Sequence, residues 1–401
     1  MIGKYTIEAY LIFILAIVCL LILSNIISLN TNGFLWDLDV YTRAVNDYSQ
    51  GVDPYRDDVG FLFVYHPYVL KFFSFLSHIL RIELWLLALY FISTIFFFRE
   101  FIFFSRSSHN SPSKEVKFSV FSIILVSLCY GGAGLTAIQT GNITIFLHFF
   151  LLAVFLNSYR KKSLKKYYFL AFSIFLSSIV KPYLLAYVII FPCLSLNYRV
   201  LYFIPAVIFA SAAIWLSGPL LAPDLFEKFM SALKYQTIGK GDLGYTIFGL
   251  IAHRVGEANG IIIHTFTMLF FLISFIVYLK NFNFNFQSER FFPLIIVFVI
   301  FVNPRMKIYD FPIAVLFGYY YLWSSSLSLF KVIRVIAFSL FISSTPLLSA
   351  AFRKFGIFEP SDFLLDPRLF QIIGFSFIFA IIVSSVRKLP KHEDVRSSSL
   401  R

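Results

Sequence analysis

Charged residues are scarce in this chain. Asp, Glu, Lys and Arg make up 14% of its 401 residues, whereas 59% of the residues are hydrophobic. A soluble domain cannot bury that much apolar surface, because a folded chain keeps a large surface relative to its volume. The mean hydropathy is +0.80, and several apolar runs approach the roughly 17–25 residues that a helix needs to cross a bilayer. The composition therefore predicts an all-α polytopic membrane protein.

Cysteine is equally rare. Cys19, Cys129 and Cys193 lie far apart inside apolar segments, a spacing that predicts neither a disulfide framework nor a metal site. No P-loop and no GxGxxG motif occurs, so we expect no nucleotide cofactor. The net charge of +13 comes largely from short loops between apolar runs, which indicates membrane topology rather than a nucleic-acid partner.

About twelve apolar segments qualify as candidate spans. The first is too long for the core of a signal peptide, so we interpret it as a retained span. The two segments flanking "VKPY" are short for full crossings and indicate a broken pair or tilted half-helices. The candidate spans are 5–29, 84–104, 118–134, 142–157, 166–180, 183–197, 199–221, 260–280, 291–304, 308–327, 331–349 and 368–387.

The positive loops indicate the sidedness of the chain. With a cytoplasmic N-terminus, "RSSHNSPSKEVK" (106–117) and "RKKSLKK" (160–166) are both cytoplasmic, as the positive-inside rule requires. The extracytoplasmic elements are then 30–83 and 222–259. Segment 61–80 is apolar enough to span, but a crossing there would move "RKKSLKK" outside, so we predict interfacial or re-entrant helices for it.

This assignment gives one integral membrane domain over residues 1–390 and a polar cytoplasmic tail at 391–401, in the cell (inner) membrane. Both termini are predicted to be cytoplasmic. Within 222–259, the stretch "PDLFEKFMSALKYQ" places Leu225, Phe229, Ala232 and Leu233 on one helical face, which predicts an amphipathic interfacial helix.

Polar residues at the ends of the spans gather on the extracytoplasmic side. Each has an ordinary explanation alone, such as a helix cap for Asp37 or a snorkelling side chain for Lys181. Together, cations and a carboxylate on one side of a bundle indicate an anion site beside a base. The set comprises Asp37, Asp39, Gln139, Asn142, Lys181, Arg254, Arg305, Lys307 and Asp310.

The histidines have simpler interpretations. His66 and His78 lie on an apolar segment without a carboxylate at ligand spacing, which favours packing over metal binding. His148 and His264 fall inside candidate spans, and we expect them to be hydrogen-bonded core residues. We predict no metal-ligating residues.

The combination of cations and a carboxylate fits transfer of a sugar from a lipid phosphate. Arg and Lys bind a phosphate and stabilise it as it leaves. A carboxylate takes the proton from an acceptor hydroxyl as that hydroxyl attacks the anomeric carbon. Such a reaction needs no nucleotide cofactor.

Five motifs occur in order along the chain: "DLDVYTRAVNDYSQGVDPY" (37–55), "VYHPYVLKFF" (64–73), "QTGNITIFLHFFLLA" (139–153), "VKPY" (180–183) and "NPRMKIYDF" (303–311). In these motifs the chain resembles the polyprenol-phosphate-mannose-dependent mannosyltransferases of glycosyltransferase family 87, in the GT-C superfamily. It departs from that pattern where Gly141-Asn142 replaces a Gly-Gln pair.

The resemblance implies a GT-C-type bundle and a role for each matching residue. Asp37 matches the catalytic Asp through its four-residue spacing to Tyr41, and Asp39 is the nearest competitor. Lys181, Arg254, Arg305 and Lys307 match the phosphate side. The other implied substrate contacts are Tyr41, His66, Gln139, Asn142 and Asp310.

The expected activity is transfer of a hexose, by resemblance mannose, from a polyprenyl-phosphate donor to a lipid or glycan acceptor hydroxyl on the extracytoplasmic side. The partners would be these two substrates and the membrane lipids, with no nucleic acid. Three alternatives stay open from the residues alone. They are a lipid-linked glycan transporter (a flippase), a polysaccharide polymerase or ligase of similar architecture, and a non-catalytic scaffold.

Overall fold

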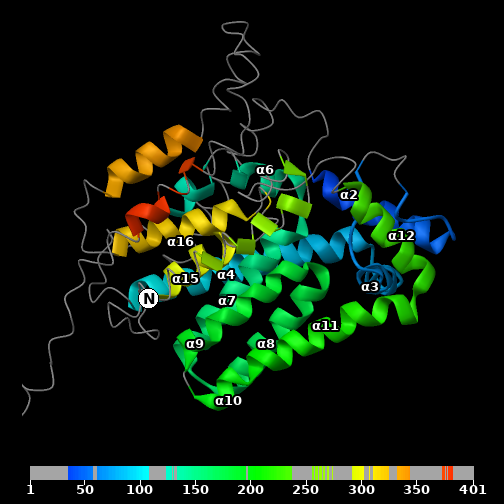
Figure 1. Cartoon of the computed structure of the whole chain (residues 1–401), viewed down its shortest axis with the longest axis horizontal. Helices are drawn as coiled ribbons and strands as arrows, with labels where there is room; N and C mark the ends of the chain where they lie inside the picture. The colour runs from blue at the N-terminus through cyan, green and yellow to red at the C-terminus, as the bar shows by residue number, and fades with distance from the viewer. Residues whose placement is uncertain are drawn as a thin grey trace, which may run out of the picture.

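The computed structural model describes residues 35–56, 61–107, 123–128, 130, 133–195, 197–236, 291–301, 307, 310–324 and 332–343, with scattered positions in 255–273 and 373–382. Within these ranges every regular element is a helix and no strand occurs, so the described chain is all-α (Figure 1). The candidate span 5–29 lies outside the described residues. The candidates 118–134, 183–197, 260–280, 291–304, 308–327, 331–349 and 368–387 lie partly outside them.

The described ranges contain the following principal helices, in chain order. They are α2 (Trp36–Ser49), α3 (Pro67–Ser77), α4 (Ile82–Ser107), α6 (Ala133–Thr140), α7 (Ile143–Lys161), α8 (Leu164–Val180), η2 (Pro182–Ile190), α9 (Phe191–Leu194), α10 (Tyr198–Leu201), α11 (Phe203–Leu221), α12 (Pro223–Lys234), α15 (Phe291–Phe301) and α16 (Phe311–Ser324).

Three described helical segments are long and apolar enough to cross a membrane: Ile82–Ser105, Ile143–Lys161 and Tyr198–Leu221. They coincide with candidate spans 84–104, 142–157 and 199–221. The described part of the protein is therefore all-α, with helices that suit a membrane. α7 is buried along most of its length between α4 and α8, which explains why its sequence is apolar on every side (Figure 1).

α7 runs further than expected, into the basic stretch "RKKSLKK". Its last turn includes Arg160, whose Nη2 donates to Oε2 of the buried Glu100 on α4 at 2.8 Å. A second donor, Asn157 Nδ2, lies 3.3 Å from Oε1 of the same carboxylate. Part of this stretch is therefore a packing contact between α4 and α7 and not only a loop.

The predicted break at "VKPY" is confirmed. α8 ends at Val180, Lys181 is extended with φ −137 and ψ 102, and the 3-10 helix η2 begins at Pro182. Proline has no backbone N–H and disfavours helical backbone in the residue before it, so the chain leaves the helix at Lys181. A 3-10 helix of nine residues is unusually long.

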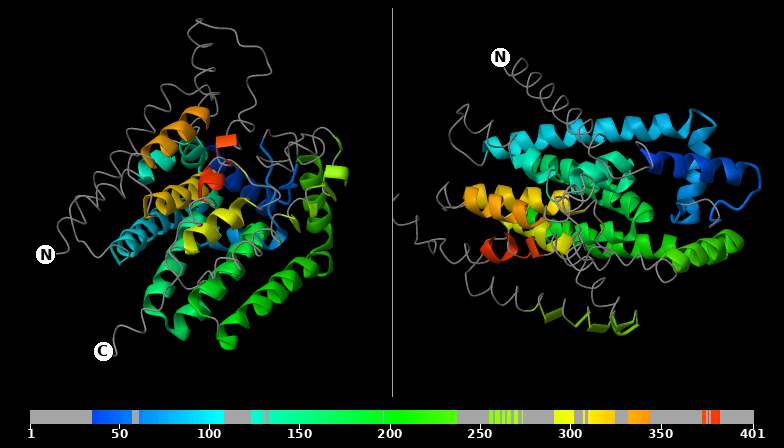
Figure 2. Two further views of the ribbon diagram at one scale, coloured as in Figure 1. Left: turned by 60° about the vertical axis from the view of Figure 1, so that its left-hand side comes forward. Right: turned by 90° about the horizontal axis from the view of Figure 1, so that it is seen from above.

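α2, α3 and α12 gather at one end of the bundle (Figures 1 and 2). α3 has 11 residues, which at 1.5 Å per residue is about half of a roughly 30 Å hydrocarbon core. α12 is the amphipathic helix expected from its sequence, with Phe229 and Ala232 buried and Leu225 and Leu233 packed against the core.

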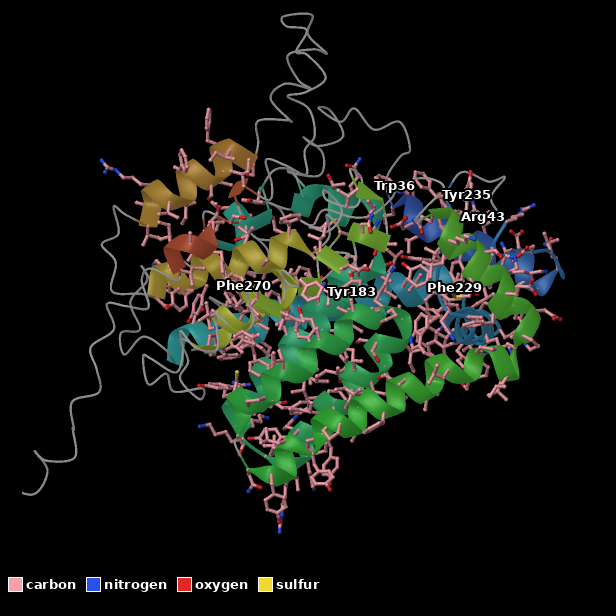
Figure 3. All side chains as sticks on the ribbon, viewed as in Figure 1. Trp36, Arg43, Tyr183, Phe229, Tyr235 and Phe270 are labelled. Carbon is pink, nitrogen blue, oxygen red and sulfur yellow. The ribbon has the colours of Figure 1, made fainter. Side chains whose placement is uncertain are left out.

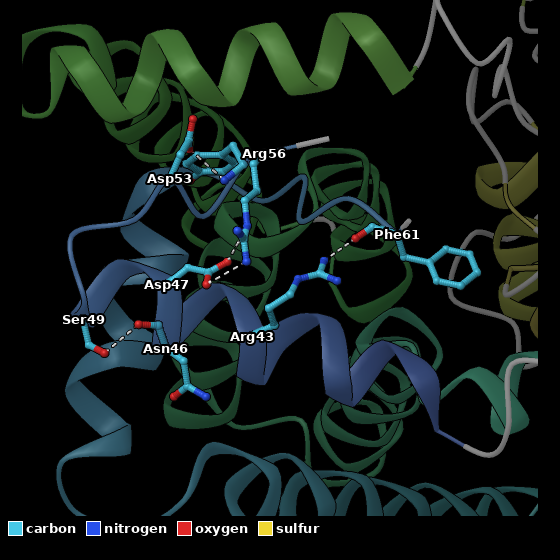
Figure 4. A network of polar contacts seen from close by, with 8 residues as sticks. Arg43, Asn46, Asp47, Ser49, Asp53, Arg56 and Phe61 are labelled. Carbon is cyan, nitrogen blue, oxygen red and sulfur yellow. Dashed lines mark hydrogen bonds and ion pairs between the residues drawn. The ribbon is translucent and has the colours of Figure 1, made fainter. Parts of the chain in front are cut away.

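Hydrogen bonds hold the segment between α2 and α3 against α2 (Figure 4). Arg56 donates to both carboxylate oxygens of Asp47 at 3.2 Å, and Arg43 donates to the carbonyl of Phe61. The Asp53 side chain accepts the backbone N–H of Tyr55 at 2.9 Å. The acidic side chains of Asp47 and Asp53 therefore have structural partners.

Candidate active site

Asp37 lies in the first turn of α2, where the helix dipole favours a carboxylate. The side chain is partly buried. Its Oδ2 accepts a hydrogen bond from Asn142 Nδ2 at 2.7 Å, across 105 residues of sequence. The structure therefore joins the first and third of the five sequence motifs through one side-chain contact.

Asn142 is oriented by its second role, as the N-cap of α7. Its Oδ1 accepts the backbone N–H of Thr144 at 3.0 Å. With the carbonyl oxygen used as the cap, the amide nitrogen necessarily faces the other way, toward Asp37. The cap thus fixes a donor against the carboxylate.

Two tyrosines pack behind this pair. The Tyr41 and Tyr65 hydroxyls are 2.8 Å apart, and the Tyr41 hydroxyl also accepts the backbone N–H of Ile143 at 3.2 Å. Burial raises the pKa of both phenols well above the usual tyrosine range. They therefore stay neutral and fix α2 against the start of α7.

Lys181 brings positive charge to the same place. Its Nζ lies 4.0 Å from the centroid of the Tyr65 ring, a cation–π contact. Lys181 also interacts electrostatically with Asp37. A carboxylate, an amide donor, two phenols and an ammonium group thus come together from α2, the segment before α3, α7 and the break after α8.

The pKa of Asp37 is raised to about 6. Burial is the main cause, because removal from water disfavours the charged carboxylate. The hydrogen bond from Asn142 and the charge of Lys181 both lower the pKa and offset part of that effect. The result is a carboxyl group that changes protonation close to neutral pH.

A second polar cluster joins the residues before α16 to α7 and η2. The Asp310 carboxylate precedes α16 and is fully buried, and its Oδ1 lies 2.7 Å from His148 Nε2 and 3.1 Å from the Tyr183 hydroxyl. Its Oδ2 accepts the backbone N–H of Lys307 at 2.7 Å. Tyr183 comes from η2 and lies in the middle of the described bundle (Figure 3).

The other proposed site residues lie in different places. Asp39 is exposed on α2 and is not part of the Asp37 contacts. Gln139 is buried at the end of α6, where its carbonyl accepts the N–H of Leu35 at 2.6 Å. Arg254 and Arg305 are outside the described residues.

His66 belongs to an aromatic cluster rather than to the Asp37 contacts. It caps α3, with Nδ1 accepting the Tyr68 N–H at 3.3 Å, and its ring packs against Trp215, Phe226 and Phe229 (Phe229 is labelled in Figure 3). Burial lowers its pKa to about 4 and keeps it neutral, with a smaller opposing effect from the Trp215 carbonyl. Pro219 explains why that carbonyl is available, because proline cannot donate to the residue four positions earlier.

Sequence reasoning missed Tyr65 and Tyr183 as contributors to the site. Tyr65 precedes His66 in "VYHPY", and Tyr183 follows Lys181 by two residues in "VKPY". Their position within these motifs is the sequence feature that could have indicated them. His148 was expected to be a hydrogen-bonded core residue, and it is: it is buried and contacts Asp310 and, through Nδ1, the Tyr187 hydroxyl at 2.6 Å.

The described residues contain no group of three or more His, Cys, Asp or Glu side chains that could hold a metal ion. A comparison with models of known protein families finds no match for this chain, and a comparison with curated proteins finds no significant match either. The functional argument therefore depends on the residues themselves.

Proposed function

We propose that this protein is a GT-C-type membrane glycosyltransferase. It would move a hexose, mannose by the sequence resemblance, from a polyprenyl-phosphate donor to a hydroxyl of a lipid or glycan acceptor. The proposal includes about twelve spans, interfacial helices near 61–80 and 223–234, cytoplasmic termini and a site that faces away from the cytoplasm.

The observation that supports it most directly is Asp37 itself. A general base works best when its pKa lies close to the operating pH, and the pKa of Asp37 is raised to about 6. Asn142 holds the carboxylate at 2.7 Å, and Lys181 supplies positive charge nearby. A base beside a cation is what sugar transfer from a phosphate requires.

In the proposed reaction, the acceptor hydroxyl oxygen attacks the anomeric carbon of the donor. The bond between that carbon and the phosphate oxygen breaks, and its electron pair leaves with polyprenyl phosphate. Asp37 takes the hydroxyl proton. Lys181, with Lys307 on the neighbouring segment, would stabilise the charge that develops on the phosphate.

The test compares two substitutions that differ by two positions. Asp37→Asn removes the base while its amide oxygen can still accept from Asn142, so release of polyprenyl phosphate should fall by about 10²–10⁴-fold. Asp39→Asn makes the same chemical change at an exposed position and should leave turnover within about twofold.

Purified protein is incubated with several polyprenyl-phosphate sugars and an acceptor extract, and free polyprenyl phosphate is measured. Equal activity of the Asp37→Asn variant and the wild type would refute the assignment of the base. Movement of the lipid-linked sugar across vesicles without release of polyprenyl phosphate would favour the transporter alternative instead.

A further inference from the structure

Asp310 joins its own segment, which includes Lys307, to α7 and η2 through one carboxyl group. The Tyr183 hydroxyl and the Lys307 backbone N–H donate to its oxygens, and His148 Nε2 lies 2.7 Å from Oδ1. Both oxygens therefore have protein partners, and the side chain is fully buried. These contacts fit a residue that holds protein segments together better than one that touches substrate.

The three segments are the ones that carry the candidate site. His148 lies on α7, which begins directly after Asn142, the partner of Asp37. Tyr183 lies two residues after Lys181, and its hydroxyl also contacts the Thr144 side chain in the first turn of α7. Lys307 is itself a candidate phosphate ligand. One buried carboxylate thus sets the relative position of the groups before α16, on η2 and on α7.

These contacts use an oxygen on each side of the Asp310 carboxyl group. An asparagine at the same position has one acceptor oxygen and one donor nitrogen. If its oxygen accepted from His148 and Tyr183, its NH2 group would face the Lys307 N–H, donor against donor, and the buried N–H would lose its partner.

We propose that Asp310 is a positioning residue that fixes the Lys307 segment against α7 and η2, and thereby sets the geometry of the donor-phosphate site. The consequence for catalysis rests on the glycosyltransferase function proposed above. The positioning itself does not, because the hydrogen bonds exist without substrate.

The first arm of the test measures backbone protection. Hydrogen–deuterium exchange at the Lys307 amide should accelerate by about 10-fold or more in Asp310→Asn, because a buried hydrogen bond is lost. Tyr183→Phe removes a donor to Oδ1 only, so the Lys307 amide should stay protected. Asp47→Asn removes a different buried carboxylate, the partner of Arg56, and should also leave the Lys307 amide at the wild-type rate.

The second arm measures steady-state kinetics with the polyprenyl-phosphate sugar that the wild type uses. Asp310→Asn should raise KM by about 10-fold with a smaller change in kcat, because ground-state phosphate binding is weakened. Asp310→Glu, which keeps a carboxyl group with two oxygens, should recover part of that loss. Tyr183→Phe should raise KM by about two- to fivefold.

The exchange and kinetic measurements distinguish a failure of the proposed glycosyltransferase function from a failure of the positioning role of Asp310. Absence of transfer by the wild type with every donor would refute the glycosyltransferase function, while the exchange arm would still decide the role of Asp310. Wild-type Lys307 exchange in Asp310→Asn would overturn the positioning role. Loss of kcat with unchanged KM and unchanged exchange would overturn it too, and would make Asp310 part of the chemistry. If Asp310→Asn does not accumulate, an unchanged KM in Tyr183→Phe contradicts the proposal.

Discussion

At the scale of single residues, Asn142 explains why Asp37 differs from Asp39. Both acids lie in the first turn of α2, but only Asp37 is held by an amide from another helix. The amide is available because the oxygen of Asn142 is committed to the cap of α7. A residue that looks like a turn amide in the sequence therefore tunes the proposed base.

This pairing predicts a shift of the pH profile. Ser is as good an N-cap as Asn, so Asn142→Ser should preserve α7 but remove the amide donor to Asp37. That hydrogen bond lowers the Asp37 pKa, so its loss raises the pKa above about 6. Because the base must be deprotonated, the acidic limb of kcat/KM should move to higher pH. The profile is measured between pH 5 and pH 9.

Asn142→Ala serves as the second variant in that experiment. It removes the cap as well, so it should show the same pH shift together with a loss of about 1 kcal/mol of stability. An acidic limb that stays in place in both variants would show that Asn142 does not tune the group responsible for it.

At the scale of elements, the junction between α6 and α7 positions the Asp37 carboxylate. Gly141 has φ +67, a backbone conformation that residues with a Cβ rarely adopt. A Cβ there would lie 2.9 Å from Leu35 Cδ2 and 3.3 Å from Leu35 Cα. Leu35 is the N-cap of α2 and has φ 60, and its N–H is bound by the carbonyl of Gln139. The start of α2 is therefore in direct backbone contact with the last turn of α6, beside the junction with α7.

Gly141→Ala should push the start of α2 away from the junction between α6 and α7. Two effects add at this position, the unfavourable φ and the contact with Leu35, so we expect a loss of about 1–3 kcal/mol of stability and a clear fall in turnover. Gly51→Ala is the matched control, because Gly51 has φ +74 but nothing within 4 Å of the added Cβ. The two variants are compared by thermal unfolding in detergent and by release of polyprenyl phosphate, and an equal effect in both would contradict the packing argument.

At the scale of the whole molecule, the raised Asp37 pKa links stability to pH. The folded pKa is about 6 against an ordinary value of 3.8, so the folded state binds the proton more tightly than the unfolded state. This contribution is fully present below pH 3.8 and is lost as the pH rises through about 6. The fold should then be less stable by up to about 3 kcal/mol above that range.

Asp37→Asn should remove this loss of stability above pH 6 even though it slows transfer. We expect the variant to be about 1–3 kcal/mol more stable than the wild type at pH 7, with the difference vanishing near pH 4. Thermal unfolding is measured at both pH values, and Asp39→Asn, at the exposed position, should show no such gain. A variant that is less stable at pH 7 would mean that the ionised carboxylate stabilises the fold.

The sequence by itself determined the all-α membrane class, the helices α4, α7 and α11, the break at "VKPY" and the amphipathic face of α12. These features are local, because they follow from apolar periodicity, proline chemistry and the length of a bilayer span. The ordered motifs also mark Asp37, Asn142, Lys181 and Asp310 as candidate site residues.

Only the tertiary structure decided which of these residues meet. It put Asn142 against Asp37, Lys181 over Tyr65, and Asp310 between His148, Tyr183 and Lys307, and it put His66 into a separate aromatic cluster. The reason is physical: a hydrogen bond across 105 residues, as between Asn142 and Asp37, depends on how helices pack. The same packing removes the water that would otherwise hold a carboxyl pKa near its ordinary value.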